Sequence, residues 1–536
     1  MIDVLIIGSG GAGLSSALKA KDNGSNVLVV SKSLPTYSQT AQAQGGINAI
    51  LYEDHDSVDE HIEDTYKASH GLAIKENIKF LCENAKDTIL WLDSIGVPFN
   101  RDVKENIAQR KFGGTKKIRT CYSSDYTGLK IIHTLYDQCI KENIEFKNEH
   151  FLLELIAENN ICKGAIFLDI NNGEIVEILA KTTILATGGY AGIYSINTTN
   201  SILTTGDGIA TAFKAGVELS NMEFIQFHPT SLIGNNILIS ESARGEGAYL
   251  IDEDGLRFID ELKPRDEVSR AIFKKLEEGK KVYLDLRHLG LEKIKDTIPQ
   301  ERKLAFEFLN IKIEEELLPI VPAAHYTMGG IKTNLNGETN IKNLFACGEC
   351  ANASIHGANR LGGNSLLEII TLGKNTGVYA SNKAKEISSF ESIGEIINHY
   401  EEKLSLILEK ENKKNFYTLK KELSIELFDK IGLFRNEENI NKFIEKLNSI
   451  NEDFLKAGIN DKSKIYNKNL IEYLEFENII LLSKLISMCA KERKECRGSH
   501  FRTDYVFTSD DYKLNSITKF IGEKIYNKFE EIHNEN

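Results

Sequence analysis

The N-terminal segment "DVLIIGSGGAGLSSALKAKDNGSNVLVVSK", residues 3–32, constrains the fold more than any other part of the chain. It consists of an apolar run, a glycine-rich turn, a helical pattern, a second turn and a second apolar run, which is the pattern of a βαβ unit. Gly8, Gly10 and Gly13 fit the G-x-G-x-x-G spacing, in which the glycines permit a tight turn, close approach to a pyrophosphate and close packing of helix on strand. The helix N-terminus would then face the phosphates. The segment therefore predicts a dinucleotide-binding domain.

The residues that follow favour FAD over NAD as the dinucleotide. Ser31 and Lys32 stand where an acidic residue is expected to bind a ribose hydroxyl, and this departure weakens NAD more than FAD. The next stretch, "YSQTAQAQGGINAI" at 37–50, is rich in small, amide and glycine residues. Such a run suggests backbone lying close against a ligand, and we expect that ligand to be a flavin.

Composition excludes several classes of protein. A chain of 536 residues with 41% hydrophobic and 27% charged residues is long enough for two to four domains of ordinary globular type. The formal net charge of −13 argues against a nucleic-acid partner but leaves room for a basic pocket that binds a small anion. The N-terminus has no basic region ahead of its apolar run, and no later segment supplies about 18 uninterrupted apolar residues. We therefore expect a cytoplasmic protein, with any membrane contact made through partner subunits.

The eight cysteines do not form a metal-binding pattern. Cys347 and Cys350 are the one close pair, and without a second pair there is no four-cysteine set for zinc or an iron–sulfur cluster. We expect no metal and free thiols in a reducing compartment. A redox-active disulfide at Cys347 and Cys350 is the alternative interpretation.

Two later strand-to-glycine edges indicate how the domains are arranged. "KTTILATGGYAG" at 181–192 and "NLFACGECANA" at 343–353 each read as a strand that ends in glycine, which suggests one sheet assembled from separated segments. The fold class expected is α/β: a Rossmann-like FAD-binding domain of residues 1–225 and 331–383, with an inserted α+β capping domain at 226–330. Residues 384–536 are rich in Lys, Glu, Ile and Leu, and we expect a C-terminal helical domain.

Five stretches outside the glycine turn concentrate residues that can bind an anion. They are "FHPTSL", "LISESARGEGAY", "KPRDEVSR", "AAHYTMGG" and "HGANRLGGNSLLE". They supply His228, Ser240, Glu241, Arg244, Glu246, Arg265, Arg270, His325, His356, Arg360, Asn364 and Ser365. Each residue alone has an ordinary structural interpretation. Together they suit a pocket for a small dicarboxylate, because arginine binds carboxylate bidentately while histidine and hydroxyl groups fix its orientation.

The order of these motifs and the residues within them resemble those of a known family. The glycine turn, "AQGGIN", "FHPT", "RGEG", "HYTMGG", "GANRLGGNSLLE" and "RGSHFRTDY" are similar to those of the flavoprotein subunit of succinate dehydrogenase and fumarate reductase, of which L-aspartate oxidase is a close relative. The resemblance runs from residue 1 to about residue 510. It implies an FAD-dependent oxidoreductase that interconverts fumarate and succinate by hydride transfer between flavin N5 and one olefinic carbon.

The resemblance also assigns residues to roles. Those implied to bind FAD are Gly8, Gly10, Gly11, Gly13, Ser31, Lys32, Ser38, Gln39, Thr40, Gln44, Gly45, Gly46, Asp207, Glu349, Ser365 and Leu366. Those implied to contact substrate are Phe112, His228, Ser240, His325 and Arg360. Arg265 matches the arginine that transfers the proton, and Glu241 and Arg244 match its relay. Arginine is a poor acid in isolation because its pKa exceeds about 12, so it needs such neighbours.

Gln39 departs from the respiratory members of this family. In the stretch matching "YSQTAQ", they carry a histidine at the place of Gln39, and this histidine bonds covalently to the flavin 8α-methyl group. The amide nitrogen of glutamine is not a comparable nucleophile, because its lone pair is delocalised into the carbonyl group. We therefore expect a non-covalent FAD. Without the covalent bond, the reduction potential of the flavin should be lower, and a lower potential favours fumarate reduction over succinate oxidation.

Two alternatives remain open at this stage. L-Aspartate oxidases make iminoaspartate for NAD biosynthesis, and they carry a glutamate in the segment matching "QRKFGGTKK", where this chain has Phe112. That difference favours the dehydrogenase and reductase branch, although the length of the chain is closer to that of the oxidases. A non-catalytic FAD-bearing assembly protein is the second alternative. For the enzyme, we expect a small dicarboxylate substrate and a separate iron–sulfur subunit that passes electrons to a membrane or soluble carrier.

Overall fold

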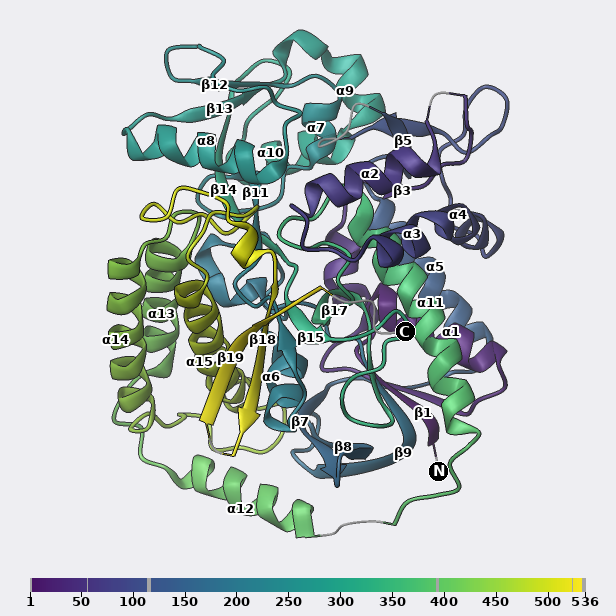
Figure 1. The fold of residues 1–536 in the computed structure, drawn as a ribbon, viewed down its shortest axis with the longest axis vertical. Helices are drawn as coiled ribbons and strands as arrows, with labels where there is room; N and C mark the ends of the chain where they lie inside the picture. The colour runs from purple at the N-terminus through teal and green to yellow at the C-terminus, as the bar shows by residue number, and fades with distance from the viewer. Residues whose placement is uncertain (1, 55, 113–116, 392–394, 523, 533–536) are drawn as a thin grey trace.

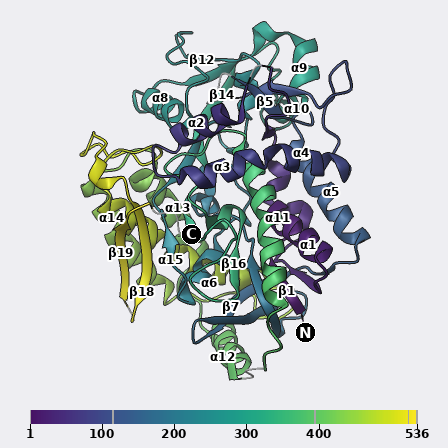
Figure 2. The ribbon, with the colours of Figure 1, turned by 45° about the vertical axis from the view of Figure 1, so that its right-hand side comes forward.

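The computed structural model describes residues 2–54, 56–112, 117–391, 395–522 and 524–532. Figures 1 and 2 show a flavin-domain sheet with its helices in the lower part of the molecule, an inserted cap above it, and a C-terminal helical part along one side. None of the helices in those ranges is both long and apolar enough to cross a membrane.

A largely parallel sheet forms the centre of the flavin domain. Its path is β6-β2-β1-β9-β8-β7, and β16 adds to β9. The strands are β1 (Ile2–Ile7), β2 (Val27–Val30), β6 (Glu145–Lys147), β7 (His150–Glu158), β8 (Ile161–Asp169), β9 (Ile175–Leu185) and β16 (Leu344–Ala346). The strands β1, β9 and β16 come from three distant parts of the sequence and pair in parallel, which confirms that separated segments build one sheet.

The sheet is buried on both faces, which explains its continuous apolar runs. Successive residues of β1 join different cores: Val4 and Ile6 pack in one cluster, Leu5 and Ile7 in the other. Helices of this domain are α1 (Gly11–Asp22), α5 (Thr127–Lys141), α6 (Asp207–Lys214) and α11 (Asn364–Ala384). The glycines of α11 let it touch α1, since a Cβ at Gly377 would lie 2.3 Å from the Ser16 carbonyl oxygen.

A second group of short elements lies between the sheet and the cap. It comprises the 3₁₀ turns η1 (Pro35–Tyr37) and η2 (Gln39–Gln42), the helices α2 (Val58–Ala68), α3 (Lys75–Glu83) and α4 (Ala85–Ser94), and the strands β3 (Ile47–Asn48), β4 (Gln109–Lys111) and β5 (Ile118–Cys121). The three strands pair in the order β3-β5-β4. This group carries the "YSQTAQAQGGINAI" stretch and Phe112 toward the cap.

The inserted cap has its own antiparallel sheet and its own core. Its strands pair in the order β11-β14-β13-β12. They are β11 (Ile225–Leu232), β12 (Tyr249–Asp252), β13 (Val282–Asp285) and β14 (Leu318–Thr327). Its helices are α7 (Glu241–Gly245), α8 (Arg265–Glu277), α9 (Leu291–Thr297) and α10 (Pro299–Leu309), with the turn η4 (Arg287–Leu289). A separate apolar cluster that includes Val268, Ile272 and Leu284 fills the space between sheet and helices.

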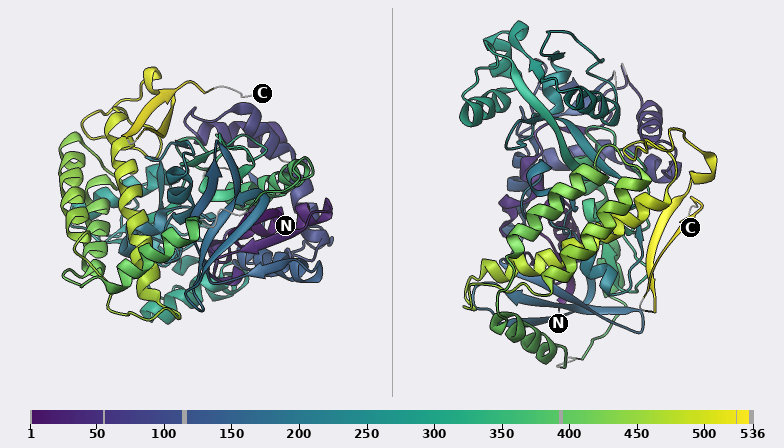
Figure 3. Two further views of the ribbon diagram at one scale, coloured as in Figure 1. Left: turned by 90° about the horizontal axis from the view of Figure 1, so that it is seen from below. Right: turned by 90° about the vertical axis from the view of Figure 1, so that its left-hand side faces the viewer.

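The C-terminal part is helical up to Glu492 and then changes character. Its helices are α12 (Glu395–Glu409), α13 (Phe416–Ile431), α14 (Glu437–Phe454) and α15 (Lys468–Glu492). Figure 3 shows α13, α14 and α15 side by side, with a yellow hairpin at their edge. This hairpin, β18 (Asn515–Ile521) and β19 (Lys524–Glu530), was not expected from the Lys- and Glu-rich composition.

The hairpin ties the end of the chain to the flavin domain. β18 pairs with β10 (Leu219–Ser220), a strand that lies directly before the cap, and β10 also pairs with β15 (Gly330–Lys332). β17 (Ala351–Asn352) completes this sheet beside β15. The remaining short turns are η3 (Ala191–Asn197), η5 (Gly348–Cys350) and η6 (Asp510–Tyr512). The end of the chain therefore supports both segments that enter and leave the cap.

Candidate active site

One cavity lies where the glycine turn, η2, the cap and the loop before α11 converge. It is lined by every predicted cofactor residue except Gly13, namely Gly8, Gly10, Gly11, Ser31, Lys32, Ser38, Gln39, Thr40, Gln44, Gly45, Gly46, Asp207, Glu349, Ser365 and Leu366. The same cavity is lined by Phe112, His228, Ser240, Glu241, Arg265, His325 and Arg360. The structure therefore brings both predicted sets together.

The glycine turn forms one wall of this cavity. Gly8 has φ +112°, a conformation that side chains rarely adopt, and it carries the chain from β1 into α1. Gly13 lies behind the turn, where a Cβ would come within 2.0 Å of the Gly8 carbonyl oxygen. The Gly11 N–H donates to the Thr40 hydroxyl at 3.0 Å, which joins the turn to η2. The first turn of α1 therefore lies at the cavity wall, with its backbone facing the cavity.

Unpaired polar atoms in the cavity wall fit a polar cofactor such as FAD. Among the described residues, four buried side-chain atoms that line the cavity have no hydrogen-bond partner within the chain. They are Ser38 Oγ, Gln44 Oε1, Thr187 Oγ1 and Arg360 Nε. Because buried polar atoms are nearly always paired in folded proteins, these atoms indicate a ligand with several donors and acceptors. A flavin and its phosphates supply both.

Lys32 belongs to a buried ion cluster at the second strand. Its Nζ lies 2.6 Å from Asp207 Oδ2 and 2.8 Å from Glu475 Oε1. Burial would lower the Lys32 pKa, but the two carboxylates outweigh burial and raise it, so the lysine stays charged. Glu475 comes from α15 in the C-terminal part, and it was not predicted. The C-terminal helices therefore help to build the cofactor wall.

Gln39 contributes its amide oxygen to a backbone contact. Gln39 Oε1 accepts a hydrogen bond from the Ser201 N–H at 2.9 Å. This bond links η2 to the loop after β9 and fixes the orientation of the amide beside the cavity.

On the cap side, Arg265, Glu241 and Arg244 form a chain of ion pairs. Arg265 donates to Glu241 Oε2 through Nε at 2.8 Å, and Arg244 Nη2 donates to Glu241 Oε1 at 3.1 Å. Glu241 begins α7, so the i to i+3 spacing places Arg244 on the same turn. Arg244 lies behind Glu241 and is 1% exposed. This chain of ion pairs thus extends from the cavity into the cap.

The electrostatics of this chain keep Glu241 ionised. Burial would raise the Glu241 pKa, but Arg265 and Arg244 outweigh it and the pKa is lowered. Burial also lowers the pKa of Arg244, although Glu241 opposes that shift. An ionised carboxylate between two guanidinium groups is suited to accept and pass a proton.

Gln226 connects the two arginines that line the cavity, and it was not predicted. Its Oε1 accepts from Arg265 Nη1 at 3.0 Å and from Arg360 Nη2 at 3.2 Å. Its Nε2 donates to Asn359 Oδ1 at 2.8 Å. A signal existed in the sequence, since Gln226 lies two residues before His228 in β11, a strand that is buried along its whole length. A buried amide in such a strand needs partners on both ends.

Two neutral histidines face these arginines. The rings of His228 and His325 have centroids 4.9 Å apart. Burial lowers the pKa of both well below the usual range, and the positive charge of Arg265 lowers them further. His325 Nδ1 lies 2.8 Å from the Thr199 hydroxyl, which fixes the ring. Both rings therefore offer a neutral donor or acceptor.

Arg360 gives the cavity much of its positive character. Burial lowers the Arg360 pKa to about 10, and repulsion from Arg265 contributes, so the guanidinium is still charged near neutral pH. Its Cζ lies 4.1 Å from the ring centroid of Tyr326, so the two groups stack. Such a fork of donors next to a second arginine is suited to carboxylate oxygens.

Ser240 and Phe112 complete the wall. Ser240 caps α7 by accepting the Ser242 N–H at 3.2 Å, which leaves its hydroxyl proton free to donate into the cavity. Phe112 is buried, and its ring occupies the space that a Cβ on Gly45 would need. The rest of the motif after Phe112, residues 113–116, lies outside the described residues.

Five residues that the motifs suggested do not line the cavity: Arg244, Glu246, Arg270, His356 and Asn364. His356 Nε2 lies 3.2 Å from Glu368 Oε2, and Asn364 accepts from Asn48 Nδ2 at 2.9 Å. Both are structural contacts within the flavin domain. Cys347 and Cys350 are buried and carry free thiols in the structure, in agreement with the expectation of free thiols.

Comparisons with known proteins identify the relatives of this chain. The FAD binding domain family matches residues 3–366, and the fumarate reductase flavoprotein C-terminal family matches residues 420–531. The 8-methylmenaquinol:fumarate reductase flavoprotein subunit of Wolinella succinogenes is 39% identical over 95% of this chain and 86% of its own length. The succinate dehydrogenase flavoprotein subunit of Rickettsia bellii is 36% identical over 95% of this chain and 91% of its own.

Solved structures agree with these sequence matches. A quinol fumarate reductase of Escherichia coli superimposes with a TM-score of 0.95 at 31% identity, over 99% of this chain and 96% of the other. The likeness therefore includes the cap and the C-terminal part as well as the flavin domain.

The glycine turn generates a first prediction. Gly13→Ala should weaken FAD binding by about 5- to 150-fold, because a methyl group against the Gly8 carbonyl overpacks the turn at a cost of about 1–3 kcal/mol. Fluorescence titration of the FAD-free protein measures the affinity. Gly24→Asn is the matched control: Gly24 follows the other end of α1, has open space around it, and adopts a φ that asparagine tolerates. Unchanged affinity in Gly13→Ala would contradict the prediction.

Proposed function

The chain belongs to the family of flavoprotein subunits of fumarate reductase and succinate dehydrogenase, and from that premise we propose that it interconverts fumarate and succinate, with fumarate reduction as the favoured direction. It is an FAD-dependent oxidoreductase of the CH–CH group. The single observation that carries the proposal is the Arg265–Glu241–Arg244 chain, which ends beside Arg360 in the cofactor cavity.

The charges of the cavity match a dicarboxylate. Arg360 and Arg265 are two buried cations, and the rings of His228 and His325 are neutral donors nearby. We assign the carboxylate groups of the substrate to Arg360, His228, His325 and the Ser240 hydroxyl. A dianion held in this way is oriented and its double bond is polarised, which is positioning together with electrostatic stabilisation.

We propose that Arg265 carries the proton of the reaction. FAD, when bound, supplies hydride transfer to or from one olefinic carbon. An Nη–H of Arg265 gives the proton at the other carbon, Glu241 returns one to Arg265 from Arg244, and Arg244 regains its proton from bulk water. The two hydrogen bonds from Arg265 to Glu241 and the bond to Gln226 hold the guanidinium plane in place during this exchange. Charge develops beside a pre-positioned partner, which is the condition for efficient general acid catalysis.

Gln39 supports a non-covalent FAD and a direction. The amide oxygen is engaged by Ser201 N–H, and the amide nitrogen has no basic lone pair to bond the flavin. We propose that FAD is held by the glycine turn, Thr40, Ser365 and other cavity contacts alone. A flavin without the covalent link should have a lower potential, which favours fumarate reduction.

The partners follow from the same premise. The relatives named above are subunits of larger reductase and dehydrogenase enzymes, so we propose partner subunits here as well. The finer proposal is an iron–sulfur subunit that docks on the flavin domain and passes electrons to or from a membrane or soluble carrier.

Two substrates and two electron donors test the function. The purified chain should reduce fumarate with a reduced viologen dye, and it should not do so with a quinol until the iron–sulfur subunit is added. L-Aspartate should be a poor substrate, because its ammonium would sit near Phe112 and an unpaired buried charge costs several kcal/mol. Phe112→Glu should improve L-aspartate turnover relative to the apolar control Phe112→Leu. Strong hydrogen peroxide production from L-aspartate by the unmodified chain would reverse the assignment.

Arg265 is tested by removing its proton transfer while keeping its charge. Arg265→Lys should lower kcat for fumarate by about 10²- to 10⁴-fold, the usual contribution of a positioned acid, and FAD should stay bound. Arg265→Ala should be as inactive and also less stable, since Glu241 would lose a buried partner. Arg287→Lys, an exposed ion-pair arginine in the same cap, is the matched control. Retained turnover in Arg265→Lys would refute the role.

Acid precipitation tests the attachment of the flavin. After trichloroacetic acid treatment the yellow colour should appear in the supernatant, because Gln39 cannot form the covalent bond. Gln39→Ala should release its flavin in the same way and serves as the control for the position. A protein band that stays fluorescent on a denaturing gel would show that the cofactor is covalently bound and the interpretation wrong.

A further inference from the structure

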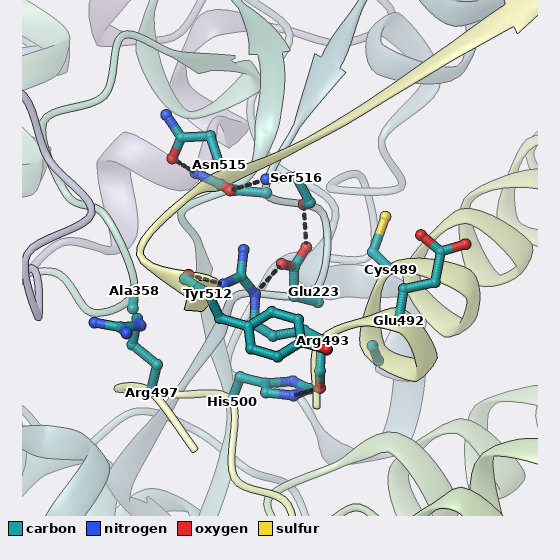
Figure 4. A network of polar contacts seen from close by, with 12 residues as sticks. Glu223, Ala358, Cys489, Glu492, Arg493, Arg497, His500, Tyr512, Asn515 and Ser516 are labelled. Carbon is teal, nitrogen blue, oxygen red and sulfur yellow. Dashed lines mark hydrogen bonds and ion pairs between the residues drawn. The ribbon is translucent and has the colours of Figure 1, made fainter. Parts of the chain in front are cut away.

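The loop of residues 493–502, here named the arginine loop, has no part in the mechanism described above. It follows α15 and contains the "RGSHFR" motif. Its arginines Arg493, Arg497 and Arg502 are buried, as is Arg435 beside them. Figure 4 shows the centre of this loop, where Arg493 lies between Glu223 and Tyr512, with His500 beneath it. Burying so many cations is costly unless each is paired.

Paired arginines make the base of the loop rigid. Arg493 Nε donates to Glu223 Oε1 at 2.6 Å, and its Nη1 donates to the Tyr512 carbonyl oxygen at 2.8 Å. Glu223 also accepts from the Ser516 hydroxyl at 2.7 Å, so the hairpin is included. His500 Nε2 lies 3.0 Å from the Arg493 carbonyl oxygen, which closes the loop on itself. The base is therefore fixed to the flavin domain just before the cap.

A second set of pairs holds the middle of the loop. Arg497 is bound bidentately by Glu495, at 2.7 and 3.0 Å, and its Nη1 donates to the His70 carbonyl oxygen at 2.8 Å. Arg435 Nη1 lies 2.8 Å from His500 Nδ1. These contacts fix the residues on both sides of the tip of the loop, which consists of Gly498 and Ser499.

The tip contacts two segments, each of which also carries one of the two cavity arginines. On one side, the backbone N–H and the hydroxyl of Ser499 both donate to the Ala358 carbonyl oxygen, each at 3.0 Å. On the other side, the Gly498 carbonyl oxygen accepts from Arg270 Nη1 at 2.9 Å. Gly498 has φ +52°, and a Cβ there would lie 2.6 Å from the Ala358 oxygen. Glycine is therefore required for this close contact.

Each contact lies next to one of the two cavity arginines. Ala358 is two residues before Arg360. Arg270 is on α8, which begins at Arg265, and its Nη2 donates to Asp266 Oδ2 at 2.8 Å. Arg265 belongs to the inserted cap and Arg360 to the flavin domain, so their separation depends on how the cap is held. The tip joins the two segments at a place outside the cavity.

We propose that the Gly498–Ser499 tip is a positioning element that sets the separation of Arg265 and Arg360 and, through it, the length of dicarboxylate that the site accepts. The proposal rests on the proposed function, since it takes these arginines as the carboxylate and proton contacts. Two fixed cations discriminate between diacids of different length, because a mismatch leaves one carboxylate poorly paired in a buried site. A loop that merely stabilises the fold would lower stability without changing this discrimination.

The test compares diacids of increasing length. Isothermal titration calorimetry of the FAD-loaded protein measures dissociation constants for malonate, succinate and glutarate. Arg270→Leu removes the hydrogen bond between the tip and the cap. Gly498→Ala places a methyl group against the Ala358 carbonyl oxygen and so displaces the flavin-domain side of the contact. In both variants the ratio of glutarate to succinate dissociation constants should fall by about threefold or more, because a looser pair of arginines discriminates less. Fumarate kcat should fall by about 10- to 100-fold, in line with a misplaced reacting group.

The controls separate positioning from folding and from the proposed function. Arg287→Leu makes the same substitution at an exposed cap arginine and should keep the wild-type ratio. Arg270→Lys keeps a donor and should restore part of the discrimination. If Arg270→Leu does not fold, Gly498→Ala gives the same readout. Ratios equal to wild type in the folded variants would overturn the positioning role. Failure of the wild-type chain to reduce fumarate, with diacid binding intact, would count against the proposed function alone.

Discussion

The shared hydrogen bond of Arg265 and Arg360 to Gln226 Oε1 is the contact on which the site depends. It brings two like charges together away from water, an arrangement that is costly for each ion. In the group formed by Arg244, Arg265, Arg360 and Glu241, two guanidinium groups bind the one carboxylate and the third, that of Arg360, binds Gln226. Under the proposed function, a doubly charged substrate would neutralise the excess of positive charge in this group.

Local patterns were enough to predict the cofactor half of the fold. The glycine turn works through contacts within residues 8–13, and the strands around it have apolar runs because the sheet is buried on both faces. Gln226 and Glu475 could not be found in the same way. Each acts through residues far away in the sequence: Gln226 meets Arg360 across 134 positions, and Glu475 meets Lys32 across 443. The motif resemblance pointed to residues that line the cavity, but not to the groups that hold them.

The end of the chain shows a competing signal. Its Lys- and Glu-rich composition indicated helix, yet "SITKFI" and "KIYNKFE" also contain the β-branched and aromatic residues that favour strands. In the structure a strand forms here, because β18 pairs with β10 and with β19. Tertiary pairing of this kind overrides local composition. The consequence reaches the site, since β10 lies just before the strand that carries Gln226 and His228.

The charge of the whole chain and the charge of the cavity have opposite signs. A formal net charge of −13 repels a dianion at long range, but salt limits that repulsion to about 8 Å at physiological ionic strength. Inside the cavity the walls are poorly polarisable, and the same unit charge acts several times more strongly than in water. Under the proposed function, the field of Arg265 and Arg360 therefore outweighs the net charge of the chain once the anion has entered the cavity. A protein with an excess of acidic residues can therefore still bind an acid, because the buried charges of the cavity act on the bound anion more strongly than the net charge of the chain does.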